Sequence, residues 1–263
     1  MIPMFFGPSD SPLFGSLHEP ESAARDHGVL LCPPVGQEHV RAHWAFRQVA
    51  ISLSRAGFHC FRFDWFGVGD SAGDLASATL ARWKEDVASA AQELRDVTGV
   101  RKVSLLGLRF GGTLATLAAG QIRPSCLVLW DPVPDGAGYL SELRHLHVEL
   151  LSDPKRYFRE GQRASRPAEI VGFDFGADLP AEIEGIHLDS LIHIPKARVC
   201  LIRSSSSPEF AEFSERLRNR KLEVEVHTTE SDGRWSAASE IETLLLPADA
   251  VRTITDYLVR RAS

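Results

Sequence analysis

"VSLLGLRFGGTLATLAAG", residues 103–120, places a glycine-bracketed turn between two regular elements. The apolar run at 103–106 predicts a buried β-strand, and residues 111–121 predict a helix. Between them stands Gly107-Leu108-Arg109-Phe110-Gly111, with Gly112 next. Small residues at these positions allow a tight turn and close packing of the helix against the strand. The sequence therefore predicts that Arg109 is held out over the carboxyl edge of a sheet.

The rest of the chain alternates short apolar runs with longer helical patterns. The predicted strands are 28–33, 58–63, 103–106, 126–130, 198–202 and 222–227, and the predicted helices are 41–55, 79–97, 111–121, 208–220 and 247–261. Most of the strands are apolar without alternation, as expected when both faces of a sheet are covered. The β–α alternation predicts an α/β protein with a mostly parallel, doubly wound sheet. Residues 9–20 predict an edge hairpin or arm before it.

One stretch, residues 133–195, breaks this alternation, because it carries many charges and no core-strand pattern. It stands between two strands of the predicted sheet. An insertion there is expected to lie over the carboxyl ends of the strands, where such sheets bind ligands. We therefore expect residues 1–132 and 196–263 to form the core and residues 133–195 to form a mostly helical cap.

Composition excludes several function classes. The 263 residues carry a formal net charge of −6 without a basic stripe, so nucleic acid is not an expected partner. No apolar run approaches the roughly 20 residues of a membrane span. The N-terminal segment lacks a basic start and contains early prolines, which is unlike a signal peptide. No His/Cys cluster has metal-ligand spacing, and no phosphate loop or dinucleotide fingerprint occurs, so neither metal nor cofactor is expected.

The four cysteines point to a reducing compartment. Cys32, Cys60, Cys126 and Cys200 each sit inside an apolar strand-like run, and none forms a C-x-x-C pair. We expect four buried thiols that act as small hydrophobes. Dispersed reduced thiols predict a cytoplasmic protein.

Three segments together carry a family resemblance. "LLCPPVGQEHVRAHWAFRQVAISLSRAGFHCFRFD" leads into "RFDWFGVGDSAGD", residues 62–74, and the glycine-bracketed turn at Arg109 follows. The chain resembles the α/β-hydrolase superfamily, in its serine-aminopeptidase-like branch. It is also similar to small hydrolase-like proteins of exosortase-associated and natural-product pathways. The resemblance covers nearly the whole chain and implies the α/β-hydrolase fold, a mostly parallel doubly wound sheet with a helical cap insertion.

The catalytic positions of that superfamily are altered here. Its nucleophile elbow is a strand, then G-x-S-x-G, then a helix, and Arg109 replaces the serine. The resemblance places the acid after strand 198–202, where the chain offers Glu209, which alternatively serves only to open a helix. The loop after the last strand has no histidine, and His227 ends the strand itself. Because a hydroxyl needs a base beside it and an orienter behind the base, a conventional serine hydrolase is not expected.

A second match to G-x-S-x-G is a decoy. Gly69-Asp70-Ser71-Ala72-Gly73 fits letter for letter, but it lies six residues beyond the predicted strand and well before the next helix. An elbow needs its serine directly at a strand-to-helix turn. We therefore interpret this stretch as a structural loop.

Arg109 has two interpretations. The start of the following helix offers free N–H groups, and the guanidinium adds charge and a planar set of donors. Together they suit a carboxylate, phosphate or enolate oxygen. Alternatively, Arg109 pairs with Asp131 in "LVLWDPV", at the end of the next strand, which would preserve the fold without chemistry.

Further candidates follow the first core strand in "PPVGQEHVRAH". Glu38 and His39 are acid–base candidates, although this segment equally suits a solvated helix entry with Arg41 and His43 exposed. The resemblance implies that backbone N–H groups in this turn form part of an oxyanion hole. The residues expected to contact substrate are Val35, Gly36, Gln37, Trp65, Leu108 and Phe110.

Two functions remain open from the sequence. The first is an enzyme of altered chemistry on an acyl, ester or thioester-type substrate in a biosynthetic pathway, with Arg109 binding an oxygen and Glu38, His39 or Asp131 moving protons. The second is a catalytically silent homologue that acts as a binding or accessory protein. Either predicts a small acyl or carboxylate ligand. An acyl-carrier protein is a candidate partner, and self-association into a homodimer is left open.

Overall fold

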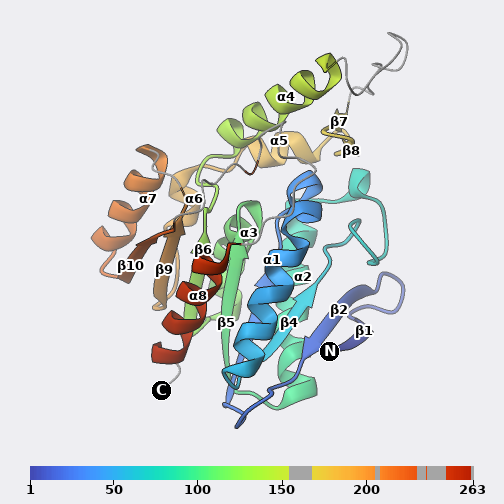
Figure 1. The fold of residues 1–263 in the computed structure, drawn as a ribbon. Helices are drawn as coiled ribbons and strands as arrows, with labels where there is room; N and C mark the ends of the chain where they lie inside the picture. The colour runs from blue at the N-terminus through green and yellow to red at the C-terminus, as the bar shows by residue number, and fades with distance from the viewer. Residues whose placement is uncertain (154–167, 205–207, 230–234, 236–246, 262–263) are drawn as a thin grey trace.

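The computed structural model describes residues 1–153, 168–204, 208–229, 235 and 247–261, and these form an eight-stranded sheet with helices on both faces (Figure 1). The strands in spatial order are β1 (Ile2–Phe6), β2 (Leu13–His18), β4 (His59–Phe63), β3 (His27–Cys32), β5 (Lys102–Leu108), β6 (Cys126–Trp130), β9 (Arg198–Arg203) and β10 (Glu223–Thr228). β1, β2 and β4 are joined by antiparallel pairings, and all the other neighbours are parallel. The mostly parallel sheet is thus confirmed. The edge hairpin, expected within residues 9–20, starts earlier, because its first strand is Ile2–Phe6.

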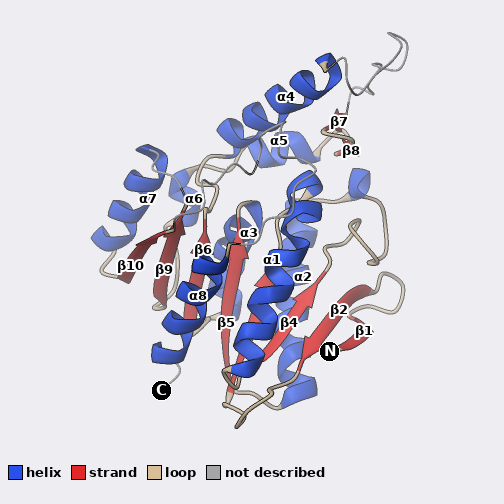
Figure 2. Ribbon diagram, viewed as in Figure 1, coloured by secondary structure: helices blue, strands red, loops and turns tan. Residues whose placement is uncertain are grey.

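Helices cover the sheet on both sides (Figure 2). α1 (Gly36–Arg55) and α8 (Ala248–Arg261) pack on one face, while α2 (Leu80–Thr98), α3 (Phe110–Ile122) and α7 (Pro208–Asn219) pack on the other. In β3, Val29 and Leu31 belong to the hydrophobic cluster on the side of α1 and α8, whereas Leu30 and Cys32 belong to the cluster on the side of α2 and α3. Both faces of the strand are therefore buried, which explains why its sequence does not alternate. A single 3₁₀ turn, η1 (Leu75–Ser77), lies in the loop before α2.

The first helix starts earlier than its periodicity predicts. α1 begins at Gly36, five residues before the expected start at 41. The added turn contains Glu38, whose negative charge is favourable at a helix N-terminus. Glu38 pairs with Arg109, which lies 71 residues away in the sequence, so the local spacing of apolar residues does not predict this turn. This extra turn brings Glu38 and His39 onto the helix.

Residues 133–195 form α4 (Gly136–Ser152), β7 (Glu169–Ile170), β8 (Phe173–Asp174), α5 (Leu179–Glu184) and α6 (Leu188–Leu191). The Asp135 side chain accepts hydrogen bonds from the backbone N–H groups of Ala137 and Gly138, which caps α4. Figure 1 shows α4 and α5 beyond the carboxyl ends of the central strands. The assignment of this segment as a separate cap with boundaries at 133 and 195 remains our proposal.

All four cysteines are buried and free, as expected. Burial raises the pKa of each thiol, because the thiolate would lose its hydration. Among the described residues, no helix is both long enough and apolar enough to cross a bilayer.

A buried histidine makes the fold sensitive to acid. His27 Nε2 lies 2.8 Å from Ser104 Oγ, and burial lowers the His27 pKa from 6.5 to about 4. The unfolded chain therefore binds a proton at a higher pH than the folded protein does, and stability falls as the pH drops from 6.5 toward 4. We expect His27 alone to remove about 2 kcal/mol of unfolding free energy between pH 7 and pH 5. Urea unfolding at both pH values measures this loss.

The matched variants are His27→Gln and, on the exposed face of α4, His145→Gln. His27→Gln should lower stability at pH 7 but reduce the further loss at pH 5, whereas His145→Gln should keep the full loss. Equal pH dependence in both variants would contradict the assignment to His27.

Candidate functional site

The turn after β5 keeps the geometry of a nucleophile elbow although it carries arginine. Arg109 has φ 51° and ψ −127°, a strained backbone conformation for a non-glycine residue. A Cβ atom on Gly107 would lie 2.4 Å from Gly112 Cα, and one on Gly111 would lie 2.1 Å from the Pro33 carbonyl oxygen. The flanking glycines are therefore required, and the turn has not relaxed around its bulky central residue.

The Arg109 side chain is held by carboxylates. Its Nε donates to Glu38 Oε1 at 2.7 Å, and its Nη2 donates to Glu142 Oε2 at 2.9 Å. The Tyr139 hydroxyl donates to the other oxygen of Glu38 at 3.0 Å. Tyr139 also stacks on Phe110, with ring centroids 5.4 Å apart and planes 3° apart. One buried carboxylate thus joins the elbow to α1 and α4.

Burial and pairing compete at this ion pair. The Glu38 side chain is 2% exposed and that of Arg109 is 13% exposed. Burial raises the pKa of Glu38, and the Arg109 guanidinium and the Tyr139 hydroxyl oppose that rise. Burial alone would lower the pKa of Arg109, but Glu38 and Glu142 outweigh it, so the pKa is raised and the guanidinium stays charged.

The alternative pairing of Arg109 with Asp131 is not formed. Asp131, at φ 42° just after β6, accepts hydrogen bonds from the Ser204 backbone N–H at 2.7 Å, the Ser204 hydroxyl at 2.6 Å and Trp235 Nε1 at 2.8 Å. Its two oxygens are therefore occupied by neighbours from the ends of other strands. Arg109 and Asp131 nevertheless line the same cleft.

Trp235 stands in the loop after β10, where the resemblance places the catalytic histidine. An indole N–H can only donate a hydrogen bond, so it orients Asp131 but cannot accept a proton. Buried Arg41 donates to the Trp235 carbonyl oxygen, which corrects the expectation that Arg41 is exposed. The sequence analysis missed Trp235, although a lone tryptophan in a polar loop at that position was an available signal.

The cleft, called here the Arg109 cleft, has a volume of about 380 Å³. Carboxyl groups on its walls outnumber the cation, and they belong to Asp131, Asp135, Glu142 and Glu209. Aromatic walls come from Tyr139, Phe210 and Trp235. Because two carboxylates already contact Arg109, the cleft is less suited to a free anion than the sequence predicts. Within the described part of the chain, Arg109 Nη1 has no hydrogen-bond partner and is the donor left for a ligand.

Glu38 and His39 face different cavities. Successive residues on a helix point about 100° apart, so both cannot reach Arg109. His39 Nε2 lies 3.7 Å from Asp64 Oδ1, on the wall of a second cavity. The structure therefore brings Arg109, Glu38 and Asp131 to one region and leaves His39 outside it. The hypothesis of a Glu38–His39 acid–base pair on one substrate does not fit this geometry.

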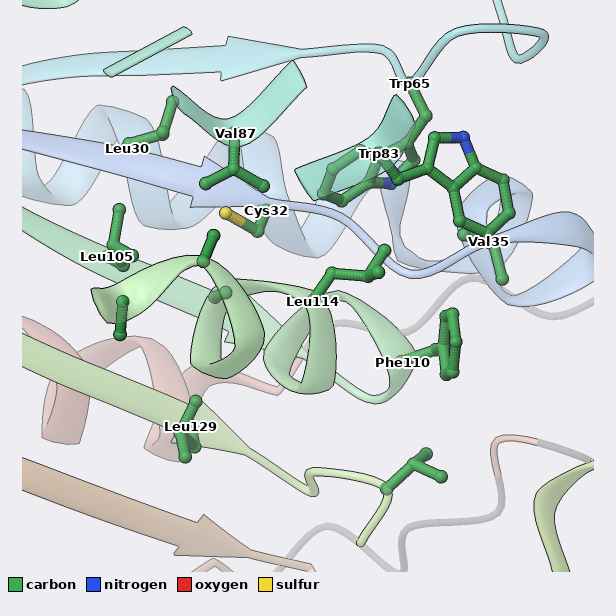
Figure 3. Close-up of a cluster of buried hydrophobic side chains, with 14 of the residues drawn as sticks. Leu30, Cys32, Val35, Trp65, Trp83, Val87, Leu105, Phe110, Leu114 and Leu129 are labelled. Carbon is green, nitrogen blue, oxygen red and sulfur yellow. The ribbon is translucent and has the colours of Figure 1, made fainter. Parts of the chain in front are cut away.

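Most residues expected to contact substrate lie in the core instead. Figure 3 shows Val35, Trp65 and Phe110 among buried side chains, and Leu108 is also fully buried. Trp65 Nε1 donates to the Pro33 carbonyl oxygen at 3.0 Å, which satisfies its polar atom inside the core. Gly36 lies beneath the Phe175 ring, and Gln37 is half-buried. Neither these residues nor the four core residues line the Arg109 cleft.

Two other sequence candidates have structural contacts. The Ser71 hydroxyl donates to the Asp64 carbonyl oxygen at 2.6 Å and accepts from the Phe14 N–H at 2.9 Å, consistent with its interpretation as a loop residue. His227 lies in β10 beside Glu225 and Tyr257. Neither residue lines the Arg109 cleft.

Comparisons with known proteins agree on the fold. Residues 36–207 match the family model described as serine aminopeptidase, S33. Human palmitoyl-protein thioesterase ABHD10, mitochondrial, is 34% identical over 115 residues, which are 40% of this chain and 36% of the human protein. The chain thus spans about a third of the length of the curated relatives it matches.

Solved structures are similar over almost the whole chain. The Pyrococcus furiosus esterase Pf2001 has a TM-score of 0.69 and 17% identity, covering 100% of this chain and 91% of the esterase. The bottromycin epimerase BotH, solved with bottromycin A2, has a TM-score of 0.61 and 19% identity, covering 98% and 100%. At these identities the likeness establishes the α/β-hydrolase fold alone, and that expected fold is confirmed.

The buried ion pair should dominate the stability of this region. Glu38→Gln leaves the Arg109 charge buried with only Glu142 as partner, and we expect a loss of about 3–5 kcal/mol of unfolding free energy. The matched variant Glu142→Gln removes a carboxylate that is 47% exposed, with an expected loss of about 1 kcal/mol or less. Urea unfolding at pH 7 compares the two. Similar losses would contradict a dominant role of Glu38.

Proposed function

We propose, from the premise that this chain belongs to the serine aminopeptidase S33 family of α/β-hydrolases, that it binds an acyl, ester or thioester-type ligand without serine hydrolysis. The observation that carries this proposal is the pair of Arg109 with Glu38 at the elbow. A guanidinium stands where the family carries a hydroxyl, and the neighbouring Asp131 is bound by Ser204 and Trp235. The protein would then act as a binding or accessory protein.

The ligand class follows from the donors and walls of the Arg109 cleft. Arg109 Nη1 can donate to a neutral carbonyl oxygen, while Glu142 and Glu209 disfavour a free carboxylate nearby. Tyr139 and Phe210 offer apolar surface for the acyl part. The thioesterase name of the human relative supports an acyl thioester, and the acyl carrier would be a small thiol or an acyl-carrier protein.

A second candidate is an enzyme with non-serine acyl or carboxylate chemistry in a biosynthetic pathway. The buried Glu38, whose pKa is raised by burial, favours it as a proton-transfer group, with Asp131 nearby in the cleft. The fold neighbour named as an epimerase supports the idea that this fold hosts reactions other than hydrolysis. Cytoplasmic location and a homodimer remain part of the proposal.

We expect generic esters to remain unhydrolysed. Wild-type protein should neither turn over p-nitrophenyl acetate nor react with a fluorophosphonate probe. Arg109→Ser should also stay inactive, because Trp235 cannot serve as the base that activates a serine hydroxyl. Rapid turnover by wild type together with labelling of any serine would refute the proposal. High activity in Arg109→Ser alone would reveal a base in this cleft.

Ligand binding should depend on Arg109. A hydrogen bond from a charged donor contributes about 1.5–3 kcal/mol, so its loss should weaken binding roughly 10- to 150-fold. Titration calorimetry with S-acyl N-acetylcysteamine thioesters and the matching free acids compares wild type, Arg109→Met and Arg109→Lys. We expect the thioester to bind wild type more tightly than the free acid does. Arg109→Met and Arg109→Lys should bind the thioester roughly 10- to 150-fold more weakly than wild type.

Arg109→Lys keeps the positive charge beside Glu38 while removing the Nη1 donor, so it separates loss of the donor from loss of folding. Arg144→Met on α4, which removes an exposed charge, is the control. A thioester that binds equally well to wild type and both Arg109 variants would remove Arg109 from the site.

A further inference from the structure

A second cavity lies between α1 and the edge of the sheet, and it is called here the α1–β2 cavity. Its volume is about 260 Å³. Leu31 of β3, Arg62 of β4 and Ser16 of β2 are successive neighbours across the sheet, and all three line it. Phe46 of α1 lies on its wall. No residue of its lining belongs to the Arg109 cleft, so the two cavities are separate.

The cavity contains a cation, Arg62, that no described carboxylate contacts directly. Arg62 is half-buried, and its Nε lies 3.3 Å from His18 Nε2 while its Nη2 lies 3.6 Å from Met1 Sδ. Within the described part of the chain, no carboxylate oxygen approaches the Arg62 guanidinium within 4.0 Å. A half-buried charge whose close partners are a ring nitrogen and a thioether keeps much of its desolvation cost. An anionic group from outside would offset that cost.

Two carboxylates, Asp64 and Asp70, also line the cavity. The Asp64 charge acts to raise the pKa of Arg62, but burial outweighs it and the pKa is lowered, so Asp64 compensates the cation only in part. Asp64 Oδ2 accepts the Asp70 backbone N–H at 3.1 Å, and Asp64 Oδ1 lies 3.7 Å from His39 Nε2. Burial lowers the pKa of His18 to about 4, so His18 is neutral at pH 7 and carries no charge that would compete with Arg62 for an anion. Arg62 is therefore the side chain in this cavity best placed to receive an anionic ligand.

The lining of the α1–β2 cavity indicates that the rest of the ligand is apolar. Phe14, Leu31 and Phe46 line the cavity together with the side chain of Ala42, so most of the enclosed space is apolar. Ligand pockets commonly combine such walls with a few polar groups that fix orientation. The volume lies just below the range of roughly 300–1,000 Å³ that is usual for such pockets, which limits the ligand to a short chain or one ring.

We propose that the α1–β2 cavity is a second binding site, distinct from the Arg109 cleft, for a small apolar carboxylic acid whose carboxylate pairs with Arg62. Its planar donors match the two oxygens of a carboxylate. The apolar tail would pack between Phe46 and the sheet.

Hexanoate is the probe, with hexanol and hexylamine as uncharged and cationic counterparts. Titration calorimetry or saturation-transfer NMR should detect hexanoate binding at millimolar concentrations or below, with hexanol and hexylamine at least ten-fold weaker. Arg62→Gln should weaken hexanoate roughly ten-fold or more, because a charge-assisted pair is lost. Ala42→Leu should abolish binding by filling the cavity while Arg62 stays in place.

The matched control is Arg47→Gln on α1, which removes a nearby positive charge that stacks on Trp44 and does not line the cavity. This variant and Arg109→Met should leave hexanoate affinity within about two-fold of wild type, with folding checked by thermal melting. Failure of wild type to bind hexanoate, equal binding by Arg62→Gln, or preference for hexylamine would overturn the proposal. A loss of hexanoate binding in Arg109→Met would place the ligand in the other cleft instead.

Discussion

The ion pair between Arg109 and Glu38 is the constraint on which the rest of this site depends. Removing two charges from water costs several kcal/mol each, and the cost is recovered only by close pairing and further hydrogen bonds. Here the 2.7 Å contact of the pair is completed by Tyr139 and Glu142, so three separate segments must meet at one point. The same contact holds a non-glycine residue at φ 51°, a conformation that costs about 1–3 kcal/mol.

Around that pair, the residues at the positions where the resemblance places catalytic groups make structural contacts. The elbow carries a donor instead of a nucleophile, and the loop after β10 supplies a tryptophan N–H instead of a base. Asp131 keeps a position at the end of β6, but Ser204 and Trp235 occupy both of its oxygens. Each of these contacts satisfies a polar group that the fold buries.

Helix α1 directs side chains to two separate places in the molecule. Glu38 reaches the elbow, while His39, one residue later, faces the α1–β2 cavity. The helix therefore separates an acidic, aromatic cleft above the sheet from an apolar cavity at its edge. The first cleft has its cation neutralised by carboxylates, and the second has a cation that no described carboxylate contacts. This difference in charge compensation is the basis for assigning different ligands to them.

Local pattern determined most of the fold. The apolar runs located the parallel strands to within one or two residues, because burial on both faces imposes a continuous hydrophobic sequence. Glycines around Arg109 revealed the tight turn, since a side chain at Gly107 would collide with Gly112 and one at Gly111 with the Pro33 carbonyl. The loss of serine and the absence of a histidine after the last strand were also plain from the sequence alone.

Tertiary structure alone decided which charged groups meet. Asp131 was the nearest acid by strand order, yet Glu38 pairs with Arg109, because the extra first turn of α1 carries it over the elbow. Glu142, Tyr139 and Trp235 come from segments whose sequences do not specify their distance from Arg109. Val35, Trp65 and Phe110 were expected at a substrate surface, but packing from α2 and α4 closes over them. The spacing of apolar residues along the sequence indicates which face of an element is buried. Which side chains contact one another also depends on where every other element lies.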